Sequence, residues 1–243
     1  MNYFTYNGVR SIDMDLRIES KNIFSAPEYD ATFKSIPGRS GDLILPNGRY
    51  PNVQITYTVF VVAKTISELA EKIKDIKSWL YQDQNSYHRL TDTYDTTYYR
   101  QAVYTKSLDI EEQLNKIGQF TVSFSCKPFR YRCDGQTEMV IPVSGTVLTN
   151  PEAFPSRPII SITGDGTITL NIQNDAYNGT WKFSDFKGYI VCDSELMNFY
   201  SGTTLLNNKV IGSGFPILYP GDTTISWVGP VTELKIVPRW VAL

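Results

Sequence analysis

The sequence predicts a mainly β fold with one α-helix, divided into two domains. Aromatic residues make up 13% of the chain, including 16 Tyr and 12 Phe, and such side chains suit the half-buried surface of a pleated sheet. Short segments that alternate apolar and polar residues recur along the chain, which is typical of strands. Residues 65–80 instead repeat their apolar residues every three or four positions, which is typical of a helix.

The composition is that of a globular protein, with 243 residues of which 42% are hydrophobic and 20% charged. This length allows one large domain or two small ones, each with a sizeable core. The formal net charge of −2 provides no overall positive field toward nucleic acid or anionic lipid. No stretch approaches the roughly 20 apolar residues of a membrane span, and the first residues lack the order of a signal peptide. We therefore expect no membrane association and no nucleic-acid specificity.

The first half of the chain contains four segments with strand patterns. Residues 12–18 alternate apolar and charged side chains, which predicts a strand with one face open to water. Residues 52–63 and 117–127 are rich in β-branched and aromatic residues and are predicted to be strands. Residues 87–106 are predicted to form a hairpin whose turn lies around residues 92–96.

One helix is predicted between these strands. Thr65 is a suitable N-cap, and Glu68 three residues later completes a capping box. The apolar stripe consists of Ile66, Leu69, Ala70, Ile73, Ile76, Trp79 and Leu80. The lysines fall mostly off this stripe, so we expect them on a solvated outer face.

A change of amino-acid composition near residue 133 predicts a domain boundary. Residues 134–158 are dense in Pro and Gly, which is typical of a linker or boundary. The predicted domains are therefore 1–133 and 134–243. Residues 157–243 show short strands about 8–12 residues apart, the spacing of a β-sandwich. Within them, Gly164-Asp165-Gly166 is predicted to be the turn of a hairpin.

Residues 35–50 are predicted to form a loop, because they contain the turn dipeptides Pro-Gly, Ser-Gly and Asn-Gly. This loop also contains the apolar triplet Leu43, Ile44 and Leu45, which free loops rarely expose to water. We therefore predict a candidate assembly interface that packs against a neighbouring subunit or another protein. Its residues are Arg39, Leu43, Ile44 and Leu45.

The residues that usually carry catalysis are scarce. The single histidine, His88, lies at the start of the predicted hairpin without a nucleophile motif, so a surface or half-buried histidine is the better interpretation. Cys126, Cys133 and Cys192 are an odd number, do not suggest a disulfide framework, and match no usual zinc spacing. The sequence has no glycine-rich phosphate loop. We expect no metal, no cofactor and no enzymatic activity.

Two alternative functions involve sugars. Asp193 and Glu195 lie two positions apart on a predicted strand and could serve as the carboxylate pair of a glycosidase. Carboxylates on strands more commonly face solvent. The second domain could instead be a carbohydrate-binding module whose aromatic residues stack on sugar rings, although such residues usually serve packing. The candidates for stacking are Trp181, Tyr189, Tyr200, Tyr219 and Trp227.

Several local sequences, taken in order, resemble the distal tail protein family of long-tailed siphophages. Their order and spacing cover nearly the whole chain, although each is weak alone. The chain is short for members with inserted carbohydrate-binding modules, so it resembles the plain form. The matching segments are 37–43, 124–131, 150–160 with the following 164–166, 189–195, 215–222 with 225–229, and 238–240.

The resemblance implies a specific architecture and role. It implies an N-terminal domain with a β-sandwich, a helix and a long β-hairpin, and a C-terminal galectin-like β-sandwich. Six copies of the N-terminal domain would form a ring at the virion tail tip, after synthesis in the host cytoplasm. This homo-hexameric baseplate hub would join the tail tube protein to the tail-tip fibre or tail-associated lysin and, in many phages, to receptor-binding proteins.

Overall fold

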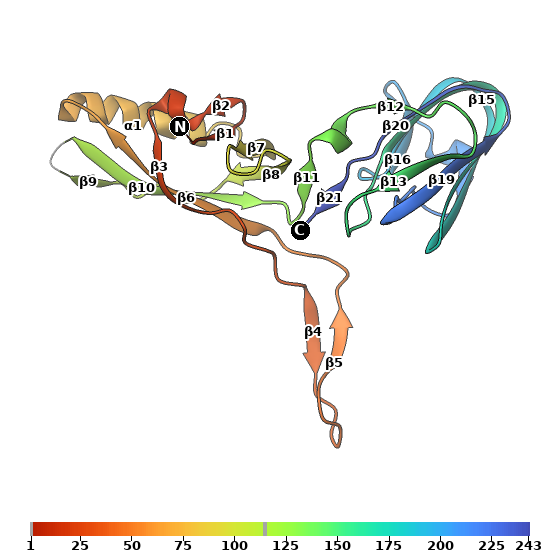
Figure 1. Cartoon of the computed structure of the whole chain (residues 1–243), viewed down its shortest axis with the longest axis horizontal. Coiled ribbons are helices and arrows are strands. Elements are labelled where there is room, and N and C mark those ends of the chain that lie inside the picture. Colours follow the sequence, from red (N-terminus) through yellow and green to blue (C-terminus); the bar gives the residue numbers. More distant parts are fainter. Residues whose placement is uncertain (1, 114–115) are drawn as a thin grey trace. The chain divides into compact units, whose positions relative to one another are not determined.

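The computed structural model describes residues 2–113 and 116–243 (Figure 1). It contains two compact units, which we call unit 1 and unit 2. Unit 1 contains the chain up to Arg130 together with Leu243, and unit 2 comprises Tyr131–Ala242. Strands dominate the described part of the chain, which contains a single α-helix. The predicted fold class, mainly β with one helix, is confirmed.

Unit 1 is built on an antiparallel sheet with the strand order β2-β1-β7-β8-β10-β6-β3. A short strand β9 adds to β10. The two longest strands, β6 and β10, pair along their whole length and alternate buried with more exposed side chains. This alternation gives the sheet one apolar face. The bounds are β1 Phe4–Tyr6, β2 Val9–Arg10, β3 Arg17–Asn22, β6 Val53–Val62, β7 His88–Asp92, β8 Tyr98–Tyr104, β9 Glu111–Gln113 and β10 Ile117–Cys126. The predicted strands 52–63 and 117–127 and the predicted hairpin 87–106 are confirmed.

The helix α1 spans Ile66–Leu80 and lies alongside the sheet (Figure 1). The Thr65 hydroxyl accepts a hydrogen bond from the Glu68 backbone N–H at 3.2 Å, which confirms the predicted N-cap. The Glu68 carboxylate in turn accepts from the Lys64 N–H at 2.9 Å. Both bonds satisfy backbone donors near the start of the helix that the helix itself leaves unpaired. The side chains that α1 buries are Leu69, Ile76, Trp79 and Leu80.

An aromatic cluster joins α1 to the sheet. Phe4 stacks on Tyr57 with ring centroids 4.5 Å apart, and Tyr6 contacts Phe124 at 4.7 Å. The indole N–H of Trp79 on α1 donates to the Tyr6 carbonyl at 3.0 Å. Aromatic pairs of this kind contribute about 0.5–1.5 kcal/mol each beyond their buried area. The cluster therefore fixes the helix, β1 and the central strands to one another.

The strand predicted at residues 12–18 is wrong. Ser11–Met14 form a 3-10 helix, and β3 begins only at Arg17. Asp15 adopts a left-handed conformation with φ 57°, and the Leu16 N–H then donates to the Ser11 carbonyl at 3.0 Å. This turn directs Leu16 into the core. The alternation of apolar and charged residues matched a strand, but the tight turn buries the same apolar residues in another way.

Unit 2 contains a nine-stranded sheet formed by β12 to β20, and the short strands β11 and β21, which are outside this sheet, pair with each other. Residues 134–158 were predicted to be a linker or boundary, but they contain a 3-10 helix, Asp134–Gln136, and two strands of unit 2. Their Pro and Gly residues therefore shape short connections rather than a free linker. The bounds are β11 Arg130–Arg132, β12 Met139–Val140, β13 Thr146–Asn150, β14 Ile159–Asn174, β15 Tyr177–Asp193, β16 Asn198–Ser201, β17 Thr204–Leu205, β18 Val210–Gly212, β19 Gly221–Val228, β20 Val231–Val237 and β21 Val241–Ala242.

Two long strands hold unit 2 together. The first part of β14 pairs with β20 and its second part with β19. The strand β15 pairs with β18 through Trp181 to Phe183 and with β16 through Val191 to Asp193. Each long strand therefore belongs to two different groups of strands. This arrangement is how strands that bend at a bulge connect the two layers of a sandwich.

The hairpin turn predicted at Gly164-Asp165-Gly166 is wrong, because these residues lie inside β14. The register with β15 shifts between Gly166 and Ile168, which marks a β-bulge. A Cβ at Gly164 would collide with the Pro230 carbonyl, and Gly166 has φ 99°. The glycines therefore permit a bend and a close backbone contact within a continuous strand. The turn of this hairpin follows at residues 175–176.

Trp181 is the largest fully buried side chain of unit 2. Its indole N–H donates to the Gly214 carbonyl at 2.8 Å. Gly179 and Gly212 contact the indole ring so closely that a Cβ at either position would overlap it. The ring therefore fits only because both neighbours lack a side chain.

We predict that Gly212→Ala destabilises the protein by about 1–3 kcal/mol, the usual cost of an overpacked core. The added methyl group would displace the Trp181 ring or the strand that carries Gly212. Urea unfolding followed by tryptophan fluorescence measures the change. The control is Ile211→Ala, because the neighbouring Ile211 side chain is 73% exposed. Equal stability of the Gly212 variant and the control would contradict the prediction.

Candidate assembly surface

The predicted loop at residues 35–50 is wrong in part, because much of it belongs to a β-hairpin. The strands β4, Ala31–Lys34, and β5, Leu43–Pro46, pair only with each other, as a separate two-stranded sheet. We call these strands and the connecting residues 35–42 the arm. Figure 1 shows that the arm is joined to the main sheet of unit 1 through the chain after β3 and before β6. The turn dipeptides shape its tip, where Gly38 and Gly41 have positive φ.

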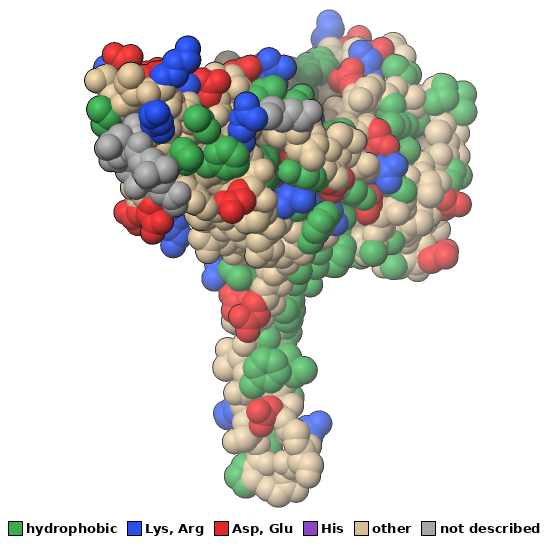
Figure 2. Space-filling view, turned by 60° about the vertical axis from the view of Figure 1, so that its left-hand side comes forward, with side chains coloured by type: hydrophobic (Ala, Val, Ile, Leu, Met, Phe, Trp, Pro, Cys, Tyr) green, Lys and Arg blue, Asp and Glu red, His purple; other side chains and the backbone are tan. Residues whose placement is uncertain are grey.

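The arm exposes apolar side chains on both of its faces, and some of them are visible along its length in Figure 2. Phe33 lies opposite Ile44 in the register, and their side chains are 63% and 56% exposed. Leu43 and Leu45 point to the other face and are 38% and 43% exposed. Residues directly opposite each other in an antiparallel pair share one face. A two-stranded hairpin that buries neither face is marginally stable alone in water.

The structure therefore brings Leu43, Ile44 and Leu45 together on one strand, whereas Arg39 lies in the exposed tip. The sequence had indicated these four residues. It had not indicated Phe33, which is more exposed than any of the three apolar ones. Phe33 could have been found by pairing residues 31–34 with residues 43–46 as two neighbouring strands. The turn dipeptides between these segments indicated a loop instead.

Asp30 holds the base of the arm. Its carboxylate accepts a hydrogen bond from the Asn47 side chain at 2.7 Å and one from the Arg49 guanidinium at 2.6 Å. These two donors hold the pKa of Asp30 below its ordinary value. Tyr29 and Tyr50 add an edge contact with ring centroids 5.2 Å apart. The base is therefore fixed by local contacts that do not involve the apolar residues farther along the arm.

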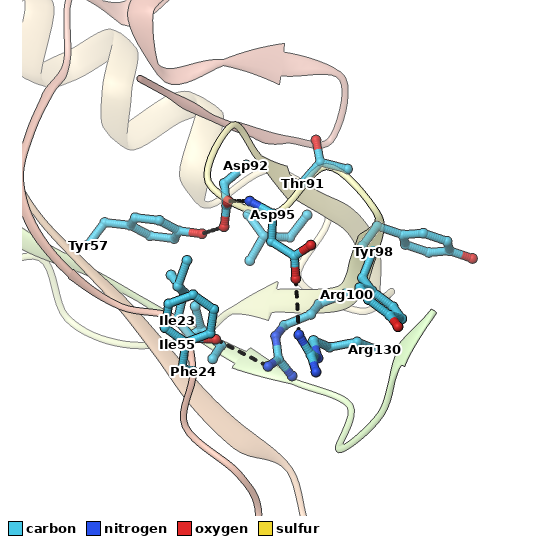
Figure 3. A pocket seen from close by; sticks show the side chains of 12 residues that line it. Ile23, Phe24, Ile55, Tyr57, Thr91, Asp92, Asp95, Tyr98, Arg100 and Arg130 are labelled. Atoms are coloured by element: carbon cyan, nitrogen blue, oxygen red, sulfur yellow. Dashed lines mark hydrogen bonds and ion pairs between the residues drawn. The ribbon is translucent and has the colours of Figure 1, made fainter. Parts of the chain in front are cut away.

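The chain segment that leads into the arm is held at a small pocket of unit 1 (Figure 3). Arg100 is 7% exposed, and one guanidinium nitrogen donates to the Ile23 carbonyl at 3.3 Å. Burial lowers the pKa of Arg100. Arg130 donates to the Asp95 carboxylate at 3.0 Å and to the Leu243 carbonyl at 2.7 Å. The bond from Arg100 connects the first residues of the segment that leads into the arm to the main sheet.

This pocket has a structural role rather than a ligand-binding one. Its volume is about 20 Å³, which is room for little more than one water molecule. Two buried donors, Arg100 Nη1 and Arg130 Nε, have no hydrogen-bond partner among the residues that the structure describes. A water molecule is the group that usually satisfies such donors. The pocket therefore fixes the position at which the arm segment leaves the sheet.

His88 and the cysteines have ordinary surroundings. The Nε2 atom of the half-buried His88 lies 2.8 Å from the Asp83 carbonyl oxygen, which is its hydrogen-bond partner in the described structure. Cys126 and Cys192 are buried, and burial raises the pKa of both thiols to about 12. Thiols with so high a pKa remain protonated and are poor nucleophiles.

Asp193 does not face solvent, contrary to the more common case for a strand carboxylate. It is 3% exposed and accepts two hydrogen bonds from the Arg239 guanidinium at 2.8 and 3.0 Å. The backbone N–H groups of Glu195 and Leu196 donate to the same carboxylate. Burial alone would raise the pKa of Asp193, but the bonds from Arg239 and the backbone outweigh it and lower the pKa. A general acid needs a raised pKa, so this arrangement favours a structural ion pair.

The aromatic candidates of unit 2 differ in exposure. Trp181 is fully buried and offers no face to a sugar. Tyr219 stacks on Tyr177 with ring centroids 5.4 Å apart. Tyr200 and Trp227 are half-buried, and Tyr189 is 46% exposed. Of the five residues that the sequence indicated, Tyr189 therefore offers the largest accessible surface for a ligand.

Within residues 2–113 and 116–243, no group of three or more His, Cys, Asp and Glu side chains is arranged to hold a metal ion. In the same residues, the helix α1 is too short and too polar to cross a membrane.

We predict that Asp193→Asn destabilises the protein at pH 7 by about 3–5 kcal/mol, because it leaves the half-buried Arg239 with only the more distant carboxylate of Glu195, 3.8 Å away. The pKa of Asp193 is lower in the folded state than in the unfolded one. Its stabilising effect is therefore complete above about pH 4, the ordinary range of a free carboxylate, and is lost as the pH falls through the folded pKa. Urea unfolding between pH 7 and 3 should show the two proteins converging in acid. The control is the exposed Asp185→Asn, and a constant difference across this range would refute the prediction.

The sequence was compared with known families and proteins. Residues 10–126 match the model of the phage tail protein RIFT-related domain. Comparison with curated proteins gives no significant match.

Solved structures give whole-chain similarities. The Dit protein (gp 19.1) of phage SPP1, described as a paradigm of the hub adsorption apparatus in phages that infect Gram-positive bacteria, aligns with a TM-score of 0.78. The sequence identity is 14%, and the alignment covers 100% of both chains. Two structures of the phage P2 baseplate in its activated conformation, with Ca and with Sr, align with a TM-score of 0.50, 11% identity and 97% coverage of each chain. The resemblance to siphophage distal tail proteins is thereby confirmed: residues 10–126 carry a phage tail protein RIFT-related domain, and the whole chain has the fold of a siphophage distal tail protein.

Proposed function

We propose that this protein is a structural hub of a siphophage baseplate, which forms a homo-hexameric ring at the virion tail tip. The observation that carries the proposal is the arm, which exposes Phe33, Leu43, Ile44 and Leu45 without burying either of its faces. A protein that keeps so many apolar side chains on a free hairpin gains stability when a partner covers them. The fold shared with a hub protein of another phage supports the choice of an assembly role.

A second copy of the same chain is the proposed partner of the arm. The arm offers main-chain donors and acceptors on its outer strand edges together with apolar side chains, and such a surface suits a protein. The charges of residues 28–49, which comprise the arm and its base, balance: Lys34, Arg39 and Arg49 against Glu28, Asp30 and Asp42. Charge therefore provides no preference for a strongly acidic or basic partner. Contacts from each arm to the next copy, repeated around an axis, close a ring.

The two units are proposed to have different roles in assembly. Unit 1 forms the ring, as residues 1–133 were expected to do. Unit 2, which covers most of residues 134–243, is a galectin-like domain for protein docking. The ring faces dock the tail tube protein and the tail-tip fibre or tail-associated lysin, and receptor-binding proteins attach at the periphery. The mechanism is geometric, so we propose no catalytic step. The ion pair with Arg239 occupies Asp193, one of the two carboxylates considered for catalysis, and supports a role without catalysis.

The oligomeric state of the full-length protein tests the hub proposal. Light scattering coupled to size-exclusion chromatography measures the mass in solution, and negative-stain electron microscopy shows the particle shape. We expect six-membered rings with a central channel at high protein concentration. A protein that stays monomeric at hundreds of micromolar, both alone and after mixing with tail tube protein, would contradict the ring.

The arm is tested separately by Leu43→Ser combined with Leu45→Ser. We expect weaker assembly, because these side chains lose the apolar area that a neighbouring copy would cover. The variant should still unfold cooperatively, because both side chains are already exposed in the isolated chain.

The matched control for the arm is Val143→Ser combined with Val147→Ser. These unit 2 side chains are 63% and 55% exposed, so the control removes exposed apolar groups outside the arm. Sedimentation velocity at several concentrations compares the three proteins. If the arm variant assembles as well as the control does, the arm is not the contact between copies.

A further inference from the structure

A hollow lies on the surface of unit 2 beside the bend of β15. Its volume is about 290 Å³, close to the lower end of small-molecule sites, which measure roughly 300–1,000 Å³. An exposed aromatic residue, Tyr189, lies at this hollow together with the nearly buried Phe186. Its lining also includes polar side chains, which are Ser184, Asp185, Lys187, Ser201, Thr204 and Lys209.

The bulge between β14 and β15 provides two of these side chains. Phe183 pairs with Ile168 and Phe186 pairs with Gly166, so Ser184 and Asp185 together lie opposite a single residue of β14. Asp185 adopts φ 49°, a conformation that redirects the chain. Bulges commonly re-aim side chains in this way next to binding sites.

The backbone near the bulge is fixed from the other strand. The Asp165 carboxylate accepts a hydrogen bond from the Gly188 N–H at 3.0 Å. Residues 186–188 also keep their pairing with β14 across the bend. The position of Tyr189 therefore rests on strand backbone rather than on a loop, and a site built on strands is better ordered than one built on loops.

The polar side chains of the hollow are available to a ligand. Across the described residues, no hydrogen bond or ion pair engages the side chains of Asp185, Lys187 or Lys209, and the same holds for the hydroxyls of Ser184, Ser201 and Thr204. Some exposed hydroxyls elsewhere in unit 2 do have partners: Thr149 donates to Asp222 at 2.6 Å, and Thr180 to Asn171 at 2.9 Å. The six polar side chains of the hollow therefore keep their donors and acceptors for a ligand.

The combination of groups indicates the class of ligand. A rigid tyrosine ring with a polar tip packs against a ligand that is apolar on one face and polar at its edge. A sugar ring has this character, with C–H groups on its faces and hydroxyls around its rim. Two lysines against one aspartate leave the hollow with a positive balance. A positively charged site attracts a ligand that carries negative charge.

We propose that this hollow binds a glycan whose sugar ring carries a carboxylate or phosphate group. Tyr189 contacts the face of the ring, the hydroxyls and Asp185 bond its rim, and Lys187 and Lys209 bind the negative group. The site lies on unit 2 and does not require the proposed arm contacts of unit 1. A failure of glycan binding therefore leaves the hub proposal intact, and a failure of ring formation leaves this one intact.

The test uses the full-length protein and four defined probes: D-glucose, D-glucuronate, D-glucose 1-phosphate and inorganic phosphate. Each is titrated at low ionic strength and followed by NMR chemical-shift changes, with saturation transfer to the sugar protons. We expect both anionic sugars to bind with Kd of about 1 mM, at least about fivefold more tightly than glucose. Inorganic phosphate alone should bind more weakly than either anionic sugar.

Variants assign the contacts. Tyr189→Ala should weaken binding of the anionic sugars by about tenfold or more, equivalent to about 1.4 kcal/mol, whereas Tyr189→Phe should retain it because the ring remains. Lys209→Ala should abolish the preference for anionic sugars over glucose. Lys182→Ala is its matched control, because Lys182 is an exposed lysine of unit 2, on β15, that does not line the hollow. Melting temperatures verify that each variant folds.

Three results would overturn the proposal. One is that neither anionic sugar binds at concentrations up to about 20 mM, a Kd too weak for a site of this size. Another is that inorganic phosphate binds as tightly as the phosphorylated sugar, which would show a simple anion site. The third is that a folded Tyr189→Ala variant binds as tightly as the natural protein.

Discussion

The packing of α1 onto one face of the unit 1 sheet is the interaction on which that unit depends. Trp79 contacts Phe4 and Tyr6 and bonds the Tyr6 backbone, so the first strand and the helix share one cluster of rings. The same cluster extends to Phe124 and Tyr57 on the two central strands. Because this one cluster fixes all these elements, the rest of unit 1 is free to serve other purposes.

Unit 2 obtains its stability by a different route. Two strands that run through both groups of pairing partners replace the covering helix, and the Trp181 side chain of β15 is buried in the hydrophobic core of the unit. The bend that such strands need is located at glycines of β14 and at the extra residues of β15. The irregular backbone at this bend lines the surface hollow, so a requirement of the fold also shapes the site that is proposed to bind a ligand.

The sequence correctly predicted those elements in which the spacing of the apolar residues matches the face that the element buries. The helix with its Thr65 cap and the strands around Val59 and Val122 belong to this class, because their periodicity matches the face that they bury. Gly164 was misinterpreted because a glycine permits a turn and a close contact equally well, and only the partner strand decides between them. The burial of Asp193 depends on Arg239, which is far away in sequence, so no local pattern contained it.

The arm has a further consequence for how this protein can change over time. Its exposed residues contact little of their own chain, and its base is fixed by Asp30, Asn47 and Arg49. In the proposed assembly role, substitutions at Phe33 or Ile44 would therefore alter the contacts of the arm with its partner and have little effect on whether unit 1 folds. Most positions in a small protein must be compatible with both folding and binding, and selection removes mutations there when either is lost. The residues of the arm contribute little to folding, so the sequence of the arm can diverge between lineages while the domain that carries it is preserved.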